Sequence, residues 1–400
     1  MIAVRDPTSF LRKEYLELVS QDLDWKLHVL QGPSAPWCTV DGKKVLMLCS
    51  NNYLSLSNHP RLKEAAIEAI KTHGAGSGSV RPIAGTMDLH MELESRMAKF
   101  KGVEASLVYQ TGFAANAGLI PQLVGKGDLI ISDELNHGSI IDGVRLSHAD
   151  RAVYKHTNVT DLAKVLADAE RHSPEHQRIL IITDGVFSMD GDIAPLDGIA
   201  NVADEHGAML YVDDAHGEGV LGEGGRGIVS HFHLSSKDVQ VEMGTFSKAF
   251  GVVGGHINGS RDLVDFAYNK SRTWLLSGSH PPAVVAACIA AIDVLETEPQ
   301  HVRNLWANTR YFKKAMNGLG FDIGRSETPI TPVMVGESSV AKELSAKLYE
   351  AGVFALPIVF PMVAKDKARI RTIMNAALTT SDLDFAINAF EKIGKELGIV

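Results

Sequence analysis

Lys248 is the residue in this chain best suited to covalent chemistry. It lies in the run Gly244 to Gly251 (GTFSKAFG), after an apolar stretch and among small and hydroxyl side chains. Burial disfavours an ammonium and lowers its pKa, which leaves a nucleophilic amine able to form a Schiff base with a carbonyl group. Thr245 and Ser247 beside it could donate hydrogen bonds to a phosphate. Taken alone, the run is more typical of a surface lysine in a loop.

An acid and a histidine, Asp213 and His216, follow another apolar stretch in the run Tyr211 to Gly217 (YVDDAHG). A buried carboxylate needs a cationic partner, and a protonated pyridinium nitrogen is one that keeps such a ring an electron sink. His216 could then hold the phenolic oxygen of the ring. The alternative is a metal site of Asp213, Asp214 and His216, which would select a hard or mixed-ligand ion. No further cluster with metal-ligand spacing supports it.

Two other runs end apolar stretches with polar residues. In Tyr109 to Asn116 (YQTGFAAN) a hydroxyl and a glycine precede a predicted helix, whose free N–H groups could bind an anion. Taken alone, this run favours a plain strand-to-helix turn. In Asp133 to Ser139 (DELNHGS), His137 could stack on a cofactor ring or be a structural histidine. The glycine-rich stretch 73–81 has neither a GxGxxG nor a Walker lysine, so we interpret it as a flexible cover or interface loop.

These side chains need a scaffold, which the alternation of short apolar runs and longer helical patterns provides. Strands separated by helices predict an α/β fold with a mostly parallel sheet, whose chemistry lies at the carboxyl ends of the strands. The predicted strands are 105–109, 129–132, 179–183, 209–212 and 239–243, and the clearest predicted helices are 89–100, 161–172 and 196–206.

The chain divides into three predicted parts. Residues 1–45 form an N-terminal helical segment, with an amphipathic helix over 9–30 that packs on its own domain or on a partner subunit. Residues 46–290 form the large domain, and 291–400 form a smaller C-terminal α/β domain that ends in an amphipathic helix over 383–397. The uncharged stretch 273–292 is interrupted by Gly278 to Pro282 (GSHPP), which predicts a loop entering a buried helix and no membrane span.

Composition excludes several classes of protein. With 39 basic and 48 acidic side chains the 400-residue chain has a net charge of −9, and 45% of its residues are hydrophobic. These values exclude a disordered protein and a disulfide scaffold. The acidic balance also argues against a general nucleic-acid binder. Three cysteines without a CxxC pair, and no signal-peptide pattern, predict a cytoplasmic protein.

Together these runs resemble the α-oxoamine synthases, pyridoxal-phosphate enzymes of the aspartate-aminotransferase fold (fold type I). The resemblance extends over nearly the whole chain and also includes residues 49–54 (CSNNYL), 81–86 (RPIAGT), 183–191 (TDGVFSMDG), 222–227 (GEGGRG) and 369–371 (RIR). It implies a large domain with a seven-stranded type of sheet, pyridoxal phosphate as cofactor, no metal, and a homodimer with active sites at the subunit interface. The implied reaction is a Claisen-type condensation of glycine or alanine with an acyl-CoA, giving a 2-amino-3-oxo acid or an α-amino ketone and CoA.

The resemblance also implies residue roles. Lys248 would be the Schiff-base lysine and the base for the substrate Cα proton, and Asp213 would pair with the pyridine nitrogen. Asn52 and Arg371 would take the substrate carboxylate, for which a guanidinium fork is well suited. The implied catalytic residues are Lys248, His137, Asp213 and His216. The implied cofactor-binding residues are Lys248, Thr111, Gly112, Phe113, His137, Ser188, Asp213, His216, Thr245, Ser277 and Gly278, of which Ser277 would reach the phosphate of the neighbouring subunit.

Within the family, the runs 136–146 (NHGSIIDGVRL) and 393–398 (IGKELG) resemble the glycine C-acetyltransferases, which gives our main expectation. The run Asp213 to Gly217 instead resembles the 8-amino-7-oxononanoate synthases. These, or a serine-palmitoyltransferase-like enzyme with a longer acyl donor, are the alternative. A fold-type-I aldolase or aminotransferase that does not use CoA, and a non-catalytic relative, are the other classes considered. The chain departs from the family pattern at Gly138, Gly278, His280 and Leu378.

Overall fold

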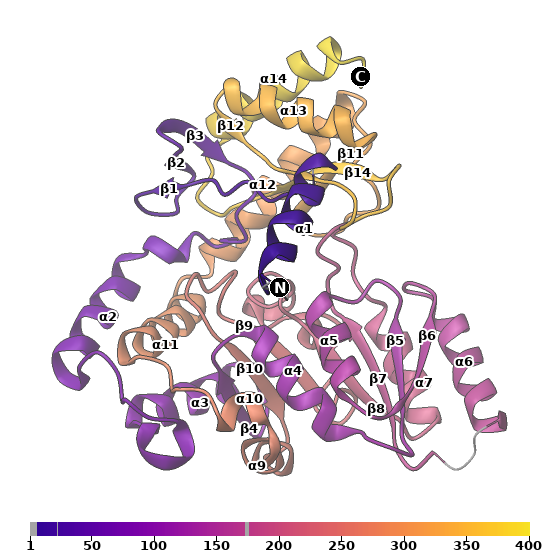
Figure 1. Ribbon diagram of the computed structural model, residues 1–400. Coiled ribbons are helices and arrows are strands. Elements are labelled where there is room, and N and C mark those ends of the chain that lie inside the picture. Colours follow the sequence, from indigo (N-terminus) through magenta and orange to yellow (C-terminus); the bar gives the residue numbers. More distant parts are fainter. Residues whose placement is uncertain (1–5, 22, 173–175) are drawn as a thin grey trace, which may run out of the picture.

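A seven-stranded sheet lies inside the larger part of the molecule in the computed structural model, which describes residues 6–21, 23–172 and 176–400 (Figure 1). Six strands run parallel, and β10 runs antiparallel to both of its neighbours. This arrangement confirms the predicted α/β class with a mostly parallel sheet of seven strands. Their order across the sheet is β4 (Ala105–Tyr109), β10 (Gly255–Gly259), β9 (Val241–Thr245), β8 (Met209–Asp213), β7 (Ile179–Asp184), β5 (Leu129–Asp133) and β6 (Asp150–Tyr154).

Both faces of this sheet are covered, because alternate side chains of each buried strand enter different cores. In β7, Leu180 and Ile182 enter one core while Ile181 enters the other. The first core contains side chains of α4 (Gly112–Leu123), α5 (Gly138–Leu146), α9 (Arg261–Lys270) and α10 (Arg272–Leu275). The second contains side chains of α3 (Asp88–Lys101), α6 (Val159–His172), α7 (Leu196–Glu205), α8 (Ile228–His231) and α11 (Pro282–Thr297).

The predicted strands and helices of this part are present, with small shifts of their ends, and two strands were missed. β9 begins at Val241, two residues later than predicted. β10 has the sequence GHING, so no apolar run marks it, although all five residues are buried. β6 is an edge strand whose first two residues are exposed, and its polar sequence lacked a strand signal.

The smaller part packs helices on a second sheet. This sheet has the order β11 (Ile330–Gly336), β14 (Ala368–Ile373) and β13 (Pro357–Ile358), all antiparallel. Its helices are α12 (Gln300–Gly318), α13 (Ser338–Glu350) and α14 (Thr380–Glu396), the last confirming the predicted C-terminal helix. Helix α2 (Pro60–His73) packs against α11 in the large part.

The N-terminal segment differs from the prediction. Helix α1 covers only Ser9–Ser20, and residues 30–47 form strands β1 (Leu30–Gln31), β2 (Trp37–Val40) and β3 (Lys43–Met47). The reason is a change of periodicity, since Trp25, Leu27 and Val29 alternate with polar residues as extended chain does. β3 pairs in parallel with β12 (Val353–Phe354), so this segment joins the C-terminal part. The divisions at 45 and 290 remain predictions. Residues 1–5 and 22 lie outside the described residues, and among the described ones the helical prediction for 1–45 is wrong beyond Ser20.

The uncharged stretch 273–292 follows its prediction. A loop leads from α10 into α11, eleven of whose residues are buried. Of the helices in the described ranges, none has the length and apolarity needed to cross a membrane.

Candidate active site

Several of the predicted site residues lie where strands of the large sheet end. Asp213 is the last residue of β8, and its neighbour in the register of β7 is Asp184. Thr245 ends β9 and leads into the loop that holds Lys248, while His137 follows β5. Because these strands are parallel, their carboxyl ends meet at one edge of the sheet, where α/β proteins bind ligands.

Buried hydrogen bonds fix the carboxylate of Asp213. Nδ2 of Asn116 donates to its Oδ2 at 2.8 Å, and the backbone N–H of Ala215 donates to its Oδ1 at 3.0 Å. The amide of Asn116 is itself oriented, because the Tyr211 hydroxyl donates to its Oδ1 at 2.7 Å. Asn116 was not assigned from the sequence, although a buried amide in the apolar helix α4 is a signal that could have found it.

Lys248 lies half-buried beside this acid. Burial lowers the pKa of its ammonium to about 8, although the charges of Asp213 and Asp184 raise it; the charge of Arg371 lowers it further. These influences place the three charged side chains around the amine. About a tenth of Lys248 is therefore neutral at pH 7 and about half at pH 8, which provides the predicted nucleophile.

His137 is the first residue outside α5 and caps that helix. Its Nδ1 lies 2.7 Å from the Ser139 hydroxyl, and its backbone N–H donates to Oδ2 of Asp184 at 2.7 Å. Burial lowers the pKa of the imidazole, while Asp213 raises it and Lys248 lowers it. Burial and the charge of Asp213 in turn raise the pKa of Asp184. His137 thus belongs to the same electrostatic site as Lys248 and Asp213.

His216 is buried, and Tyr53 orients it. The Tyr53 hydroxyl lies 2.8 Å from Nδ1 of His216, which leaves Nε2 for another partner. Burial, helped by the charges of Lys248 and Arg371, lowers the pKa of His216 far below its ordinary value, so the ring is neutral at pH 7. Tyr53 belongs to the family-like run 49–54 but had no assigned role.

A cradle for an anion lies at the start of α4. The Thr111 hydroxyl caps the helix by accepting from the N–H of Ala114 at 3.0 Å, and the first N–H groups of a helix have no intrahelical acceptor. Gly112 lies against Thr245, since a Cβ there would be 3.5 Å from the threonine Oγ1. These N–H groups and a hydroxyl suit a phosphate. Phe113 follows as an exposed residue of the same turn.

The cradle, amine and acid together fit the implied cofactor. An aldehyde needs the amine of Lys248, a pyridinium needs the buried carboxylate of Asp213, and a phosphate ester needs the start of α4. All three are provided at one edge of the sheet.

The predicted carboxylate-binding residues differ in their surroundings. Nη1 of Arg371 donates to the carbonyl oxygen of Ser188 at 3.1 Å, and its charge acts on both Lys248 and His216. Asn52 is buried, and its Nδ2 donates to the Ser57 hydroxyl at 2.6 Å. The structure therefore brings Arg371 and Ser188 to the site, while the amide of Asn52 is bound within its own loop.

Ser277 and Gly278 lie on the loop before α11. Nε2 of Gln110 donates to the Gly278 carbonyl oxygen at 2.6 Å, and Ser279 meets Ser77 of the glycine-rich stretch at 2.7 Å. His280, one of the residues at which the chain departs from the family pattern, has its pKa lowered by burial to about 4 and is therefore neutral at pH 7. The contact of Ser277 with a neighbouring subunit remains a prediction.

The alternative metal site of Asp213, Asp214 and His216 is not supported. Asp214 is turned toward Lys101, with 3.8 Å between its Oδ2 and the lysine Nζ, and its Oδ2 also accepts from the N–H of Ile228 at 2.9 Å. Within the described ranges, these three residues do not form a group with metal-ligand distances.

Comparisons with known proteins agree with this geometry. Residues 43–390 match the family described as aminotransferase class I and II. The chain is 54% identical over 393 residues to the 8-amino-7-oxononanoate synthase of Symbiobacterium thermophilum, covering 98% of this chain and 99% of that protein. It is 51% identical to 8-amino-7-oxononanoate synthase 1 of Bacillus subtilis, covering 98% of each. The solved serine palmitoyltransferase of Sphingomonas wittichii superposes with a TM-score of 0.92 at 30% identity and covers 99% of each chain.

These relatives carry a name that the sequence analysis gave as an alternative. They support the predicted family, fold and cofactor, but they do not support the more specific resemblance to glycine C-acetyltransferase. The run Asp213 to Gly217 was therefore the better guide within the family. The chain belongs to the α-oxoamine synthases, pyridoxal-phosphate-dependent enzymes of the class I and II aminotransferase family.

Proposed function

We propose that this protein is an 8-amino-7-oxononanoate synthase. The observation that carries the proposal is the 54% and 51% identity, over 98% of the chain, to two proteins of that name. The solved serine palmitoyltransferase shares only 30%. The site supports the same reading, because its amine, carboxylate and phosphate cradle suit carbanion chemistry next to an amino group.

The product name defines the substrates. In 8-amino-7-oxononanoate, C8, C9 and the amino group correspond to alanine without its carboxylate, and C1 to C7 correspond to a seven-carbon dicarboxylic acyl group. The balanced reaction joins alanine to the pimeloyl thioester and consumes one proton. It forms the C7–C8 bond, breaks the C–S and the Cα–carboxylate bonds, and releases the thiol and carbon dioxide.

The residues of this chain have distinct tasks in the proposal. Pyridoxal phosphate, when bound, supplies an electron sink for the charge that develops at the alanine Cα. Lys248 holds the cofactor aldehyde and, once freed, takes the Cα proton, for which a pKa of about 8 is well matched. Asp213 keeps the ring nitrogen protonated. Arg371 binds the alanine carboxylate.

Two other tasks belong to histidines. Neutral His216, oriented by Tyr53, can donate through Nε2 to the phenolic oxygen of the ring. His137 caps α5 on the side of Asp184 and stacks on the ring in the predicted arrangement. Ser188, Thr111, Gly112, Phe113 and Thr245 complete the cofactor site.

An activity matrix tests the proposed substrates. Alanine, glycine and serine are each combined with pimeloyl-CoA, acetyl-CoA and palmitoyl-CoA, and thiol release is measured together with product mass. We expect the highest kcat/KM for alanine with pimeloyl-CoA, with loss of one carbon dioxide. Faster reaction of glycine with acetyl-CoA would overturn the proposal and restore the first expectation of the sequence analysis.

A second experiment tests the cofactor chemistry independently of the acyl donor. Borohydride reduction of the holoenzyme followed by peptide mass spectrometry should place the reduced cofactor on Lys248. The Lys248→Ala protein should take up no reducible cofactor. Attachment at another lysine, or at the same level in Lys248→Ala, would contradict the assignment.

We also propose a homodimer. Helix α1 supports it, because none of its residues is buried and it exposes an apolar set at helical spacing: Phe10, Leu11, Tyr15, Leu16, Leu18 and Val19. Sedimentation equilibrium should give twice the chain mass of 43.2 kDa. A monomer at all concentrations would refute this part of the proposal.

A further inference from the structure

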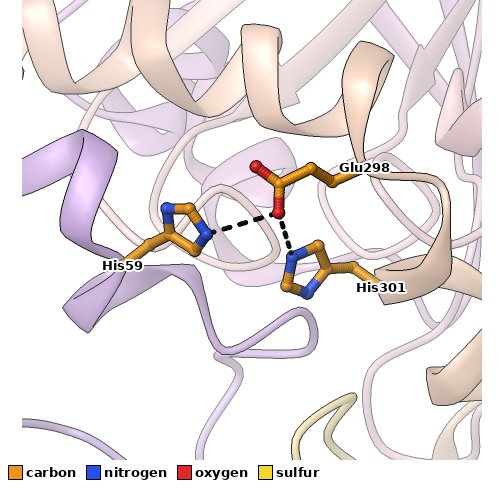
Figure 2. Close-up of side chains that lie close together, drawn as sticks. All are labelled: His59, Glu298 and His301. Atoms are coloured by element: carbon orange, nitrogen blue, oxygen red, sulfur yellow. Dashed lines mark hydrogen bonds and ion pairs between the residues drawn. The ribbon is translucent and has the colours of Figure 1, made fainter.

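Two histidines and a glutamate meet where the large sheet part joins the smaller part. His59 immediately precedes α2, Glu298 follows the last residue of α11, and His301 lies in the first turn of α12 (Figure 2). Their side chains are 16%, 25% and 21% exposed, so the cluster is mostly buried but accessible to solvent. We propose that this cluster is a binding site for a divalent transition metal of the zinc type.

The distances suit such an ion. Nε2 of His59 lies 3.6 Å, and Nε2 of His301 lies 3.3 Å, from the same oxygen, Oε2 of Glu298. Zinc bonds of about 2.0–2.2 Å in a tetrahedral site put neighbouring ligand atoms about 3.4 Å apart. All three ligand atoms lie within 4.8 Å of one another, so a small movement of the two rings completes the triangle.

The donor set selects the kind of metal. Imidazole nitrogens suit zinc, copper, nickel and iron, whereas magnesium and calcium prefer oxygen ligands alone. Two histidines and one carboxylate leave the fourth position of a tetrahedral ion open for water. In Figure 2 both rings turn one nitrogen toward the carboxylate, which is the orientation that ligands of one ion require.

The surroundings fix the carboxylate in a useful orientation. Nη1 of Arg61 contacts the other oxygen of Glu298, Oε1, at 3.1 Å. Oε2 therefore faces the two histidines, with Nε2 of Gln300 also 3.4 Å from it. Asp293, 3.9 Å from Arg61, offsets part of the positive charge that would oppose a dication.

The position gives the ion a structural consequence. It would bind the end of α11 and the start of α12 to the segment of residues 52–59, in which Asn52 donates a hydrogen bond to Ser57. A bound metal therefore stabilises the junction between the two parts of the chain. Ligands of a folded protein raise its melting temperature in proportion to the logarithm of their concentration.

The site can be tested on holoenzyme that has first been dialysed against a chelator. This protein is then titrated with zinc chloride in a calorimeter. We expect one equivalent per chain and a melting temperature that rises with zinc but not with magnesium. His301→Ala and Glu298→Gln should each weaken zinc binding by more than about tenfold. Even replacing a residue that only hydrogen-bonds to a metal ligand weakens metal binding by about tenfold or more. Cobalt chloride should give the intense visible bands of a four-coordinate ion in the wild type, but not in His301→Ala or Glu298→Gln.

A matched control lies at the other end of α2. His73 also pairs with a carboxylate, with its Nε2 3.0 Å from Asp88, but no second histidine joins them in the described structure. His73→Ala should therefore bind zinc as the wild type does. Equal zinc affinity of the His301→Ala and His73→Ala proteins, both folded by circular dichroism, would overturn the proposal, as would absence of zinc binding by the wild type.

Discussion

Replacing Lys101 by methionine should destabilise the protein, because Lys101 is the shared cation of a buried cluster of carboxylates. The ammonium of Lys101 lies 2.6 Å from Glu242, 3.1 Å from Glu218 and 3.8 Å from Asp214, and all four side chains are at most 5% exposed. His256 is the other basic group in contact, 2.9 Å from Glu218. Methionine keeps the length of the side chain and removes the charge, so the carboxylates lose their shared cation.

The expected loss follows from the burial of the cluster. Removing one partner of a buried ion pair costs about 3–5 kcal/mol, because the remaining charge is neither hydrated nor paired. The entropy of unfolding is about 2 cal/mol/K per residue, or about 0.8 kcal/mol/K for this chain. The melting temperature should therefore fall by about 4–6 °C in scanning calorimetry. Lys347→Met is the matched control, because its 2.8 Å pair with Glu396 is partly exposed and should change the melting temperature by about 1 °C or less.

The deficit should also depend on pH. Burial raises the pKa values of Asp214 and Glu242, and Lys101 lowers both. Without the lysine, the folded variant holds protons that the unfolded chain has lost, so its stability is retained at low pH and falls as pH rises. We expect a larger deficit at pH 8 than at pH 6. A Lys101→Met protein that melts within about 1 °C of the wild type at pH 8 would refute the reasoning.

Three further predictions concern the site. Asn116→Leu leaves Oδ2 of Asp213 without its donor, at a cost of about 1–3 kcal/mol, so cofactor affinity measured by absorbance titration should fall about 5- to 150-fold; an unchanged affinity would contradict the role of Asn116. The rate at which pyridoxal phosphate attaches to the apoenzyme should rise with pH around a midpoint near 8, because deprotonation of Lys248 exposes its nucleophile; a midpoint above pH 10 would show an ordinary lysine. Arg371→Lys should raise KM for the amino acid by about tenfold or more while the acyl-donor KM stays unchanged, because a lysine cannot form the two-pronged contact; equal changes in both would indicate a general disturbance.

Much of the site was readable from the sequence because its residues follow apolar strands. Asp213 ends such a strand, and Thr111, Lys248 and His137 follow one within four residues, so a parallel sheet brings them together. The same rule missed β10, whose buried GHING sequence has no apolar pattern, because its polar side chains pair with one another inside the protein.

Partners across long sequence distances could not be read in the same way. Tyr53 and His216 are 163 residues apart, and Asn116 and Asp213 are 97 apart, so only the folded chain reveals their hydrogen bonds. The N-terminal strands were missed for a related reason, since the pairing of β3 with β12 depends on a segment near the other end of the chain. Local periodicity carries no information about such pairs.

The pairing of β3 with β12 has a consequence for biosynthesis and for protein engineering. Residues 43–47 leave the ribosome long before residues 353–354, so β3 has no β12 to pair with during most of translation. A C-terminal fragment expressed separately would present β12 as an unprotected edge, which invites association with other chains. Adding residues 30–47 as a separate peptide should cover that edge, because β1, β2 and β3 belong to the same sheet as β12.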